Sequence, residues 1–409
     1  MGDVLGRIKF WIRNNYNRIV NSIAFYPAFI SLVFLIISVL LIEFDFSETG
    51  KHLKSQLTWL SLQDASTARN IIGVVAAGIL SLTVFSFSMV MIVLNQAASQ
   101  MSNRVLNKLI GNRFQQVVLG IYIGTIVFAL FLLSTIRDIN SGIYVPAIST
   151  YILIFLAIVD IFIFIYFLHY ITQSVKYEVI IDRIYSVTLL ALKDICQAER
   201  EPVAISGKGF EYKIKAPTAG VYEGVEHKAL LKLCKEHDFK IFIKVIPGTF
   251  VLEGTPILEI NINPDETLVN KIQETLYLHD DETISNNFLY GFRQLTEISI
   301  KALSPGINDP GTAALALRAL FKLFAYRFCF FPENILRDDK GISYIYITYP
   351  DFDTIFKTSI LPIWDYGHKD RIIQNEMHIL LTQFLALNKN EKLQEFLQKV
   401  NEVRNNNTD

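Results

Sequence analysis

The sequence predicts an α-helical polytopic membrane protein with four transmembrane helices and a C-terminal cytoplasmic α+β domain, which contains a small β-rich, barrel-sandwich-like module. Composition is the first reason: 51% of the 409 residues are apolar, the mean hydropathy is positive and the net charge is −1. Such a chain is not disordered and is unusual for a purely soluble protein. The second reason is four long windows almost free of charge. The third is a change in the residue pattern at residue 201, where short β-rich runs begin.

The four apolar windows are residues 24–42, 71–94, 117–136 and 145–170. Each is close to the ~20 residues that a helix needs to cross the hydrocarbon of a bilayer. They predict a four-helix transmembrane domain over residues 24–172, surrounded by the lipid bilayer.

The segment before the first window, residues 1–23, mixes basic and aromatic residues. This pattern suits a helix lying in the membrane interface, and equally a plain positive flank. The first window is too long for a signal peptide and no small-residue cleavage site follows it, so we expect a retained anchor. Basic residues also gather between the second and third windows, whereas acids dilute the first loop. This bias predicts that both termini are cytoplasmic.

Residues 173–200 alternate apolar and charged residues at helical spacing, so we expect the fourth span to continue into an amphipathic helical connector. Residues 201–263 hold the β-rich runs, punctuated by proline and glycine, with one short helix over EHKALLKLCKEH. The G-x-V and P-G-x-x-V-x-x-G-x-P-I turns of this module are similar to the biotinyl-lipoyl carrier shape. The tripeptide that flanks a carrier's modified lysine is not found, so we expect the shape without the activity.

The last part of the chain is predicted to be mainly helical over residues 264–388, with one strand-like run, SYIYIT. Residues 389–409 are predicted to be a polar C-terminal tail. The three cysteines, Cys196, Cys234 and Cys329, have neither metal-site nor disulfide-framework spacing. We expect them to be buried as small apolar residues.

A stripe of polar residues runs along the second window and continues beyond its end. Residues 71–103 carry no charge. Hydroxyls and an amide recur every seven residues, on one face of a helix. The pore-lining candidates are Ser81, Ser88, Asn95, Ser99 and Ser102. One interpretation is close helix packing through small polar residues, and the other is a water-lined pathway surrounded by copies of this helix.

The third and fourth windows contain two further features. Gly120 and Gly124 form a G-x-x-x-G motif that allows helices to approach closely. Asp160 is an intramembrane carboxylate, which costs at least ~2.5 kcal/mol and must face protein or water. It is interpreted either as a proton- or cation-handling group or as a neutral structural carboxyl bonded to a hydroxyl such as that of Thr150 or Ser81.

The segment ALSPGINDPGTA predicts a helix-turn-helix corner. Ser304, Pro305 and Gly306 end one helix, because proline cannot continue the hydrogen-bond ladder and glycine accepts left-handed angles. Asp309 then caps a second helix, with Pro310 in its first turn.

This corner leaves the polar residues Ser304 and Asn308 less well explained. Arg293 and Gln294 lie on the preceding helix, two to three turns upstream. The alternatives are a polar network that locks the cytoplasmic domain to a neighbouring subunit or to the pore mouth, and a small-ligand site. The segment lacks the Gly-Lys-Ser/Thr ending of a phosphate-binding P-loop.

Catalytic and metal-binding patterns are poor. In WDYGHKDR, His368 stands between two aspartates without a second cluster, so a solvated turn is favoured over a metal site. No G-x-S-x-G, H-E-x-x-H or G-x-G-x-x-G array has a fitting context. We expect no enzyme activity, no metal and no cofactor. The near-neutral charge gives no basic patch of the kind that binds nucleic acid.

Three stretches together resemble one known family. They are DASTARNIIGVVAAGILSLTVFSFSMVMIVLNQAASQMSNRVL, NRFQQVVLGIYIGTIVFALFLL and RQLTEISIKALSPGINDPGTA. They closely resemble the bacterial predicted integral membrane proteins grouped as domain of unknown function 2254. The resemblance runs from about the first span to the helix after Pro310. It implies the fold and a bacterial inner-membrane location, and it implies no activity.

The leading functional hypothesis is a homo-oligomeric, channel-like or transport protein for ions or small solutes, gated or assembled by its cytoplasmic domain. Four helices give one chain little room for an aqueous path, which is why we expect an oligomer. The alternative is a non-conducting membrane sensor or scaffold that signals to cytoplasmic partners. A polar stripe buried between helices of one chain would favour the scaffold.

Overall fold

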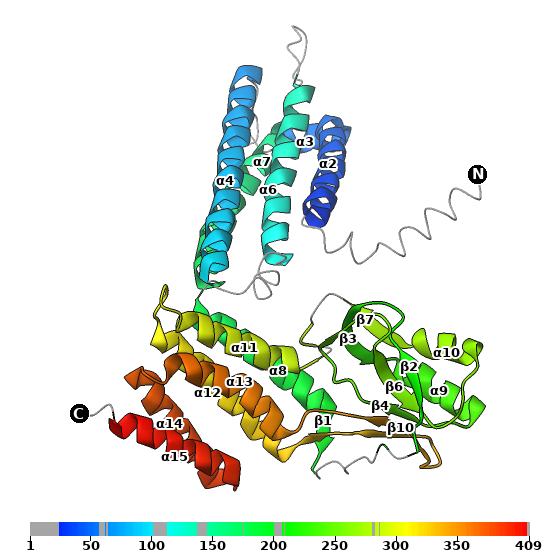
Figure 1. Cartoon of the computed structure of the whole chain (residues 1–409). Helices are drawn as coiled ribbons and strands as arrows, with labels where there is room; N and C mark the ends of the chain where they lie inside the picture. Colours follow the sequence, from blue (N-terminus) through cyan, green and yellow to red (C-terminus); the bar gives the residue numbers. More distant parts are fainter. Residues whose placement is uncertain are drawn as a thin grey trace. The chain divides into compact units, whose positions relative to one another are not determined.

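The computed structural model describes residues 24–56, 62, 64–100, 113–136, 145–174, 176–199, 207, 209–279, 283–285 and 287–406. The chain divides into two compact units, a membrane unit that ends at Lys176 and a C-terminal unit that begins at Tyr177. Each is described by itself (Figure 1). The interfacial segment predicted over residues 1–23 lies outside the described residues.

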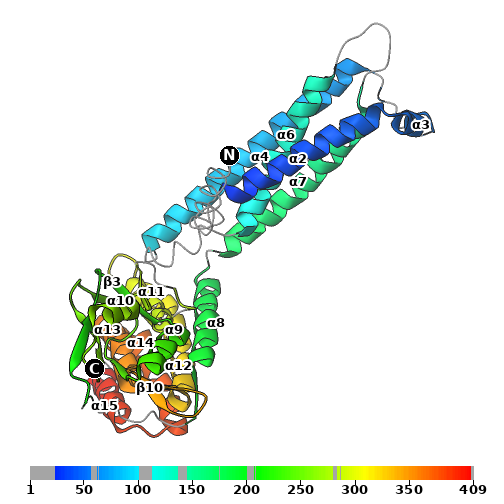
Figure 2. The same ribbon diagram turned by 90° about the vertical axis from the view of Figure 1, so that its right-hand side faces the viewer.

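The membrane unit contains four long apolar helices, which lie side by side (Figures 1 and 2). They are α2 (Phe25–Phe46), α4 (Ala65–Gln100), α6 (Arg113–Thr135) and α7 (Ala147–Ser174), with a short α3 (Glu48–Gln56) after the first. All four are long and apolar enough to cross a membrane, so each predicted span corresponds to a candidate membrane-spanning helix. Asp64 fixes the start of α4, because its carboxylate accepts hydrogen bonds from the backbone N–H of Ser66 at 3.2 Å and of Thr67 at 2.9 Å.

The G-x-x-x-G motif lies where α6 packs against α2. A Cβ atom on Gly120 would lie 2.7 Å from Ile30 Cδ1, and one on Gly124 would lie 2.7 Å from Phe34 Cγ. These distances are too short for carbon atoms in contact. The two glycines therefore allow the side chains of α2 to approach the α6 backbone.

The expected continuous connector is corrected by the structure. Helix α7 ends at Ser174, and a separate helix, α8 (Tyr177–Ile195), begins the C-terminal unit. The apolar face of α8 is buried against α11 (Leu289–Ala302) and α12 (Pro310–Cys329). The periodicity that predicted a connector therefore reflects burial in the core of this unit.

The remaining helices of the C-terminal unit are α9 (His227–His237), α10 (Glu266–Gln273), α13 (Phe352–Gly367), α14 (Arg371–Leu387) and α15 (Glu391–Asn406). The strands are β1 (Cys196–Ala198), β2 (Tyr212–Lys215), β3 (Gly220–Val225), β4 (Ile241–Ile243), β5 (Thr249–Val251), β6 (Pro256–Ile260), β7 (Leu276–His279), β8 (Phe331–Pro332), β9 (Ile335–Arg337) and β10 (Ser343–Ile347). Figure 1 shows the β-rich part beside the helices α11 to α15.

The strands form open sheets, which corrects the expected barrel-sandwich module. A five-stranded sheet has the order β2-β6-β4-β10-β9, a three-stranded sheet the order β5-β3-β7, and β1 pairs with β8. Among the described residues no closed barrel is formed. Strand β10 runs parallel to β4, with Ile345 opposite Ile241, so the sheet includes strands from beyond the predicted 201–263 module.

The predicted polar tail is also corrected. Residues Glu391–Asn406 form α15, which packs against α14 and buries Leu393 and Val400 completely or nearly so. Apolar residues spaced three and four apart in EKLQEFLQKV form the buried stripe of an amphipathic helix. High overall polarity concealed that stripe in the sequence.

The three cysteines differ in exposure, and this predicts their reactivity. Cys196 and Cys234 are buried as expected, whereas Cys329 is exposed at the end of α12, which corrects its expected burial. Burial disfavours the thiolate and raises the pKa of Cys196 to about 11 and that of Cys234 to about 12. At about pH 8, only roughly a thousandth or less of these two thiols is ionised. Maleimide labelling followed by mass spectrometry should therefore modify Cys329 first; equal labelling of all three in folded protein would contradict the structure.

Candidate functional site

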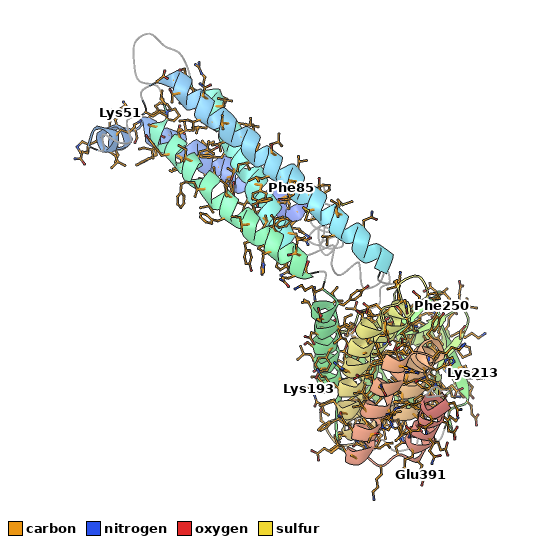
Figure 3. The ribbon with its side chains drawn as sticks, turned by 90° about the vertical axis from the view of Figure 1, so that its left-hand side faces the viewer. Lys51, Phe85, Lys193, Lys213, Phe250 and Glu391 are labelled. Carbon is orange, nitrogen blue, oxygen red and sulfur yellow. The ribbon has the colours of Figure 1, made fainter. Side chains whose placement is uncertain are left out.

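The polar stripe of α4 faces away from its own bundle. Ser81, Ser88 and Asn95 are exposed, whereas the opposite face of α4 buries Ile79 and Ser86. Figure 3 labels on this helix Phe85, whose ring centre lies 5.8 Å from that of Phe164 on α7. The stripe therefore meets whatever surrounds a single chain in the membrane, either lipid or another copy.

Among the described residues, the hydroxyls of Ser81 and Ser88 bond only within their own helix. The Ser81 hydroxyl donates to the Ala77 carbonyl at 3.0 Å, and the Ser88 hydroxyl donates to the Val84 carbonyl at 2.8 Å. Both bonds lie within α4, so the hydroxyls keep lone pairs that can accept further hydrogen bonds. Of the other candidates, the side chain of Ser99 and the whole of Ser102 lie outside the described residues.

Asp160 lies near the midpoint of α7 and is fully buried. The Thr125 hydroxyl and the Tyr122 phenol face it from α6, and Ser86 on α4 lies beside Tyr122. All four side chains are at most 3% exposed. Side chains from three helices thus meet in one polar cluster inside the bundle.

The hydroxyls that were expected to bond Asp160 do not. Thr150 donates instead to the Pro146 carbonyl at 2.9 Å, and Ser81 donates within its own helix on the exposed face. Thr125 replaces them as the neighbouring hydroxyl. The sequence could not distinguish these hydroxyls, because the packing of the helices decides which one lies beside Asp160.

Asp45, at the end of α2, is a buried carboxylate, which in the sequence is one of the acidic residues that dilute the first loop. Its carboxylate accepts hydrogen bonds from Ser149 N at 2.7 Å, Ser149 Oγ at 2.5 Å and Ile148 N at 3.2 Å, and it pairs with Lys54 Nζ at 3.1 Å. It thereby caps the first turn of α7, where free N–H groups and the helix dipole favour an anion. The available signal was its position just after an apolar window.

The segment Ser304–Pro310 forms the predicted helix-turn-helix corner between α11 and α12. Asp309 accepts a hydrogen bond from Thr312 N at 3.1 Å and Pro310 occupies the first turn of α12. Asn308 takes a left-handed conformation with φ 50°, which asparagine tolerates better than most residues. The Ser304 hydroxyl donates to the Lys301 carbonyl at 2.7 Å. A local hydrogen bond therefore accounts for Ser304, and the left-handed backbone conformation accounts for Asn308.

The corner adjoins the first residue of α8. Burial raises the pKa of Tyr177, and the nearby negative charge of Asp309 raises it further, because both oppose a phenolate. The exposed residues Pro305 and Gly306 lie at the tip of the turn. The corner thus lies beside the point where the C-terminal unit begins.

Arg293 and Gln294 are not brought to the corner. Arg293 is exposed on the first turns of α11 and lines a cavity of about 300 Å³, whereas Gln294 is buried in the core. The cavity lies between α11, α13 and the loop of residues 246–249, and Glu297 also lines it. It contains both signs of charge, which suits a small polar ligand better than an apolar one.

Contacts to the β-rich part hold side chains of the cavity wall in place. Tyr290 donates a hydrogen bond to the Glu223 carboxylate on β3, and the Arg293 guanidinium lies 6.0 Å from the centre of the Tyr290 ring. Gly248, with φ 91°, closes the loop in a conformation that favours glycine. Sequence reasoning missed this cavity because its lining comes from three segments that are far apart along the chain, residues 246–249, 289–297 and 350–359.

The WDYGHKDR segment forms the turn between α13 and α14. His368 follows the last turn of α13, and Asp370 caps α14 by accepting hydrogen bonds from Ile372 N at 2.8 Å and Ile373 N at 3.1 Å. Within the described ranges, no group of three or more histidine, cysteine or acidic side chains is placed to hold a metal ion.

Comparison with known proteins gives a consistent family and no established activity. A family model described as "Predicted membrane protein (DUF2254)" matches residues 20–383. An uncharacterised protein of Mycobacterium bovis and one of Mycobacterium tuberculosis H37Rv are each 25% identical over 333 residues, covering 77% of this chain and 63% of the relative. This chain therefore matches less than two thirds of the length of these relatives. No solved structure matches.

Proposed function

Because the chain belongs to the DUF2254 family of predicted membrane proteins, we propose that it is a bacterial inner-membrane protein whose copies assemble around α4 and conduct ions or small solutes. The observation that carries this proposal is the exposed stripe of Ser81, Ser88 and Asn95 on the face of α4 opposite its buried face. Exposed polar residues are expensive against lipid but suit a polar path or a contact with another copy.

One further observation supports assembly through this face, and another describes the path. A Cβ atom on Gly78, beside the stripe, would meet no atom within 4 Å, so this side of the helix is open to a close neighbour. The path would be polar but uncharged, because α4 carries no charge after residue 71. Hydroxyl and amide dipoles can serve either ion sign, so the path itself does not select one.

In this proposal both termini lie in the cytoplasm, and the C-terminal unit gates or assembles the oligomer. The bias of positive charge in the sequence supports the orientation. The Ser304–Pro310 corner supports the role of this unit, because it lies beside Tyr177, where the chain enters the unit from α7. No catalytic step is part of the proposal.

The stripe predicts a specific loss of flux. Ser88→Leu replaces a hydroxyl on the stripe by an apolar side chain, so flux of potassium, chloride or protons through liposomes that contain the purified protein should be lost while the protein still inserts and assembles. Phe87→Leu is the matched control, because Phe87 is exposed at the same depth but lies off the stripe. Flux retained by Ser88→Leu would count against a path along α4.

A second candidate function is a non-conducting sensor or scaffold, which the cavity beside Arg293 and Glu297 favours. A sensor needs a ligand site in its soluble part, and this cavity has the size and mixed charge of one. The oligomeric state in detergent separates the two candidates. A monomer or dimer without flux under any gradient, in protein shown to be folded, would favour the sensor or scaffold.

A further inference from the structure

We propose that Ser86, Tyr122, Thr125 and Asp160 form a buried site that binds one monovalent cation, either a proton or an alkali metal ion, inside the four-helix bundle. The site lies on the buried side of α4, whereas the proposed path follows the exposed side. It therefore stands whether or not α4 lines a path.

Five buried side-chain oxygens gather at one place inside the bundle. Ser86 Oγ, Tyr122 Oη, Thr125 Oγ1 and both carboxylate oxygens of Asp160 are buried and make no hydrogen bond that meets normal geometry within the described part of the chain. Buried polar groups in proteins are nearly always paired. Five such oxygens from three helices at one place indicate a binding site.

Asp45 is as deeply buried as Asp160 but has different neighbours. That carboxylate is fully satisfied by Lys54 and by the N-terminal turn of α7, as expected of a structural charge. Among the residues that the structure describes, none with a cationic side chain acts on Asp160. Tyr122 is the titratable group that faces it from α6, Ser86 on α4 does not titrate, and α2 is free of charge from residue 25 to 42.

The charge of the site and the type of its ligand atoms limit what it can bind. An isolated carboxylate in the hydrocarbon is unfavourable, so one positive charge must neutralise it. The set provides one carboxylate and three hydroxyl oxygens, which are hard ligands suited to a proton or an alkali ion. Divalent ions such as Ca²⁺ are usually held by more carboxylates and by six or more oxygens. The composition of the site therefore favours a single monovalent cation.

Infrared spectroscopy tests this directly, because a protonated carboxyl group has its own carbonyl-stretch band. The full chain is reconstituted in liposomes and spectra are taken from about pH 5 to about pH 9, in choline, sodium or potassium chloride. The Asp160 band is the part of the signal that Asp160→Asn removes. We expect the band at low pH in choline and its loss as pH rises.

The salt series distinguishes the two cations. Loss of the band when sodium or potassium replaces choline at fixed pH identifies an alkali ion that displaces the proton, and loss with pH alone identifies a proton site. A band that persists under every condition would mean a permanently neutral structural carboxyl and would overturn the proposal. Absence of the band under every condition, with no effect of salt, would overturn it equally.

Thr125→Val keeps the carboxyl and the side-chain shape, so it serves if Asp160→Asn does not fold. The Thr125 hydroxyl is the polar group that faces Asp160 from α6, and its removal makes the surroundings of the carboxylate less polar. The charged form is then less stable, so the band should vanish about one pH unit higher than in the wild type. Thr83→Val is the matched control, because the Thr83 hydroxyl donates to the Ile79 carbonyl at 2.7 Å within its own helix. An equal shift in both variants, or none in Thr125→Val, would count against the site.

Discussion

Gly291→Ala should destabilise the C-terminal unit by about 3 kcal/mol, at the upper end of the usual overpacking cost. A Cβ atom on Gly291 would lie 1.8 Å from Thr188 Oγ1 and 2.6 Å from Thr188 Cβ. Thr188 is fully buried on α8, and its hydroxyl donates to the Ile184 carbonyl at 2.6 Å, so it has no free space into which to rotate. The helices α8 and α11 must therefore separate.

Thermal unfolding of the full chain in detergent measures the loss, and hydrogen exchange of α8 and α11 localises it. Gly311→Ala is the matched control, since its new Cβ would be at an ordinary 3.4 Å from Asp309 Oδ1. Both changes gain up to about 1 kcal/mol of helix propensity. Similar stability of the two variants would mean that α8 does not pack on α11 as described.

A double variant refines the same test. Thr188→Ala removes two of the three atoms nearest to the new methyl group, Oγ1 and Cγ2, but leaves Cβ at 2.6 Å. Adding it to Gly291→Ala should therefore recover part of the lost stability and not all of it. The size of the recovery, in a double-mutant cycle, measures how directly the two side chains meet.

The elements that the sequence predicted well are those set by local chemistry. The four spans follow from windows without charge, and the corner follows from the backbone limits of Pro305 and Pro310 and the capping carboxylate of Asp309. The helix α9 likewise lies where its apolar spacing placed it. Each of these signals is complete within about twenty residues.

The elements that the sequence missed depend on residues far apart in the chain. Nothing in the sequence around Ser174 marks the end of α7, and α8 is distinct because its face packs against Gly291, more than a hundred residues later. The pairing of β10 with β4 has a similar separation, which is why the β-rich module looked self-contained.

The candidate sites divide in the same way. Asp160 was recognisable because a carboxylate stands alone in an apolar window, but its neighbours Tyr122 and Thr125 come from another helix. Arg293 was recognisable as a charged residue near the corner. It lines a cavity instead, because the 246–249 loop packs beside it. Sequence can therefore nominate the members of a site without giving their partners.

Asp45→Ala should destabilise the membrane unit by about 3–5 kcal/mol, the usual cost of breaking a buried ion pair by removing one partner. The change leaves Lys54 Nζ without its carboxylate. It also leaves the N–H groups of Ile148 and Ser149, at the start of α7, without their hydrogen-bond acceptor. Thermal unfolding in detergent measures the loss. Glu43→Ala is the matched control, because Glu43 is an exposed carboxylate on the same helix and should change stability by less than about 0.5 kcal/mol.

Asp45→Asn separates charge and hydrogen bonding from shape. Asparagine has nearly the same volume, but one of its two terminal groups is a donor, and the buried carboxylate is surrounded by donors from Lys54, Ile148 and Ser149. One donor must then face another, so the isosteric change should remain clearly destabilising. If Asp45→Asn behaves like the Glu43 control, the carboxylate does not hold α2 to α7, and the contrast between a satisfied Asp45 and an unsatisfied Asp160 loses its basis.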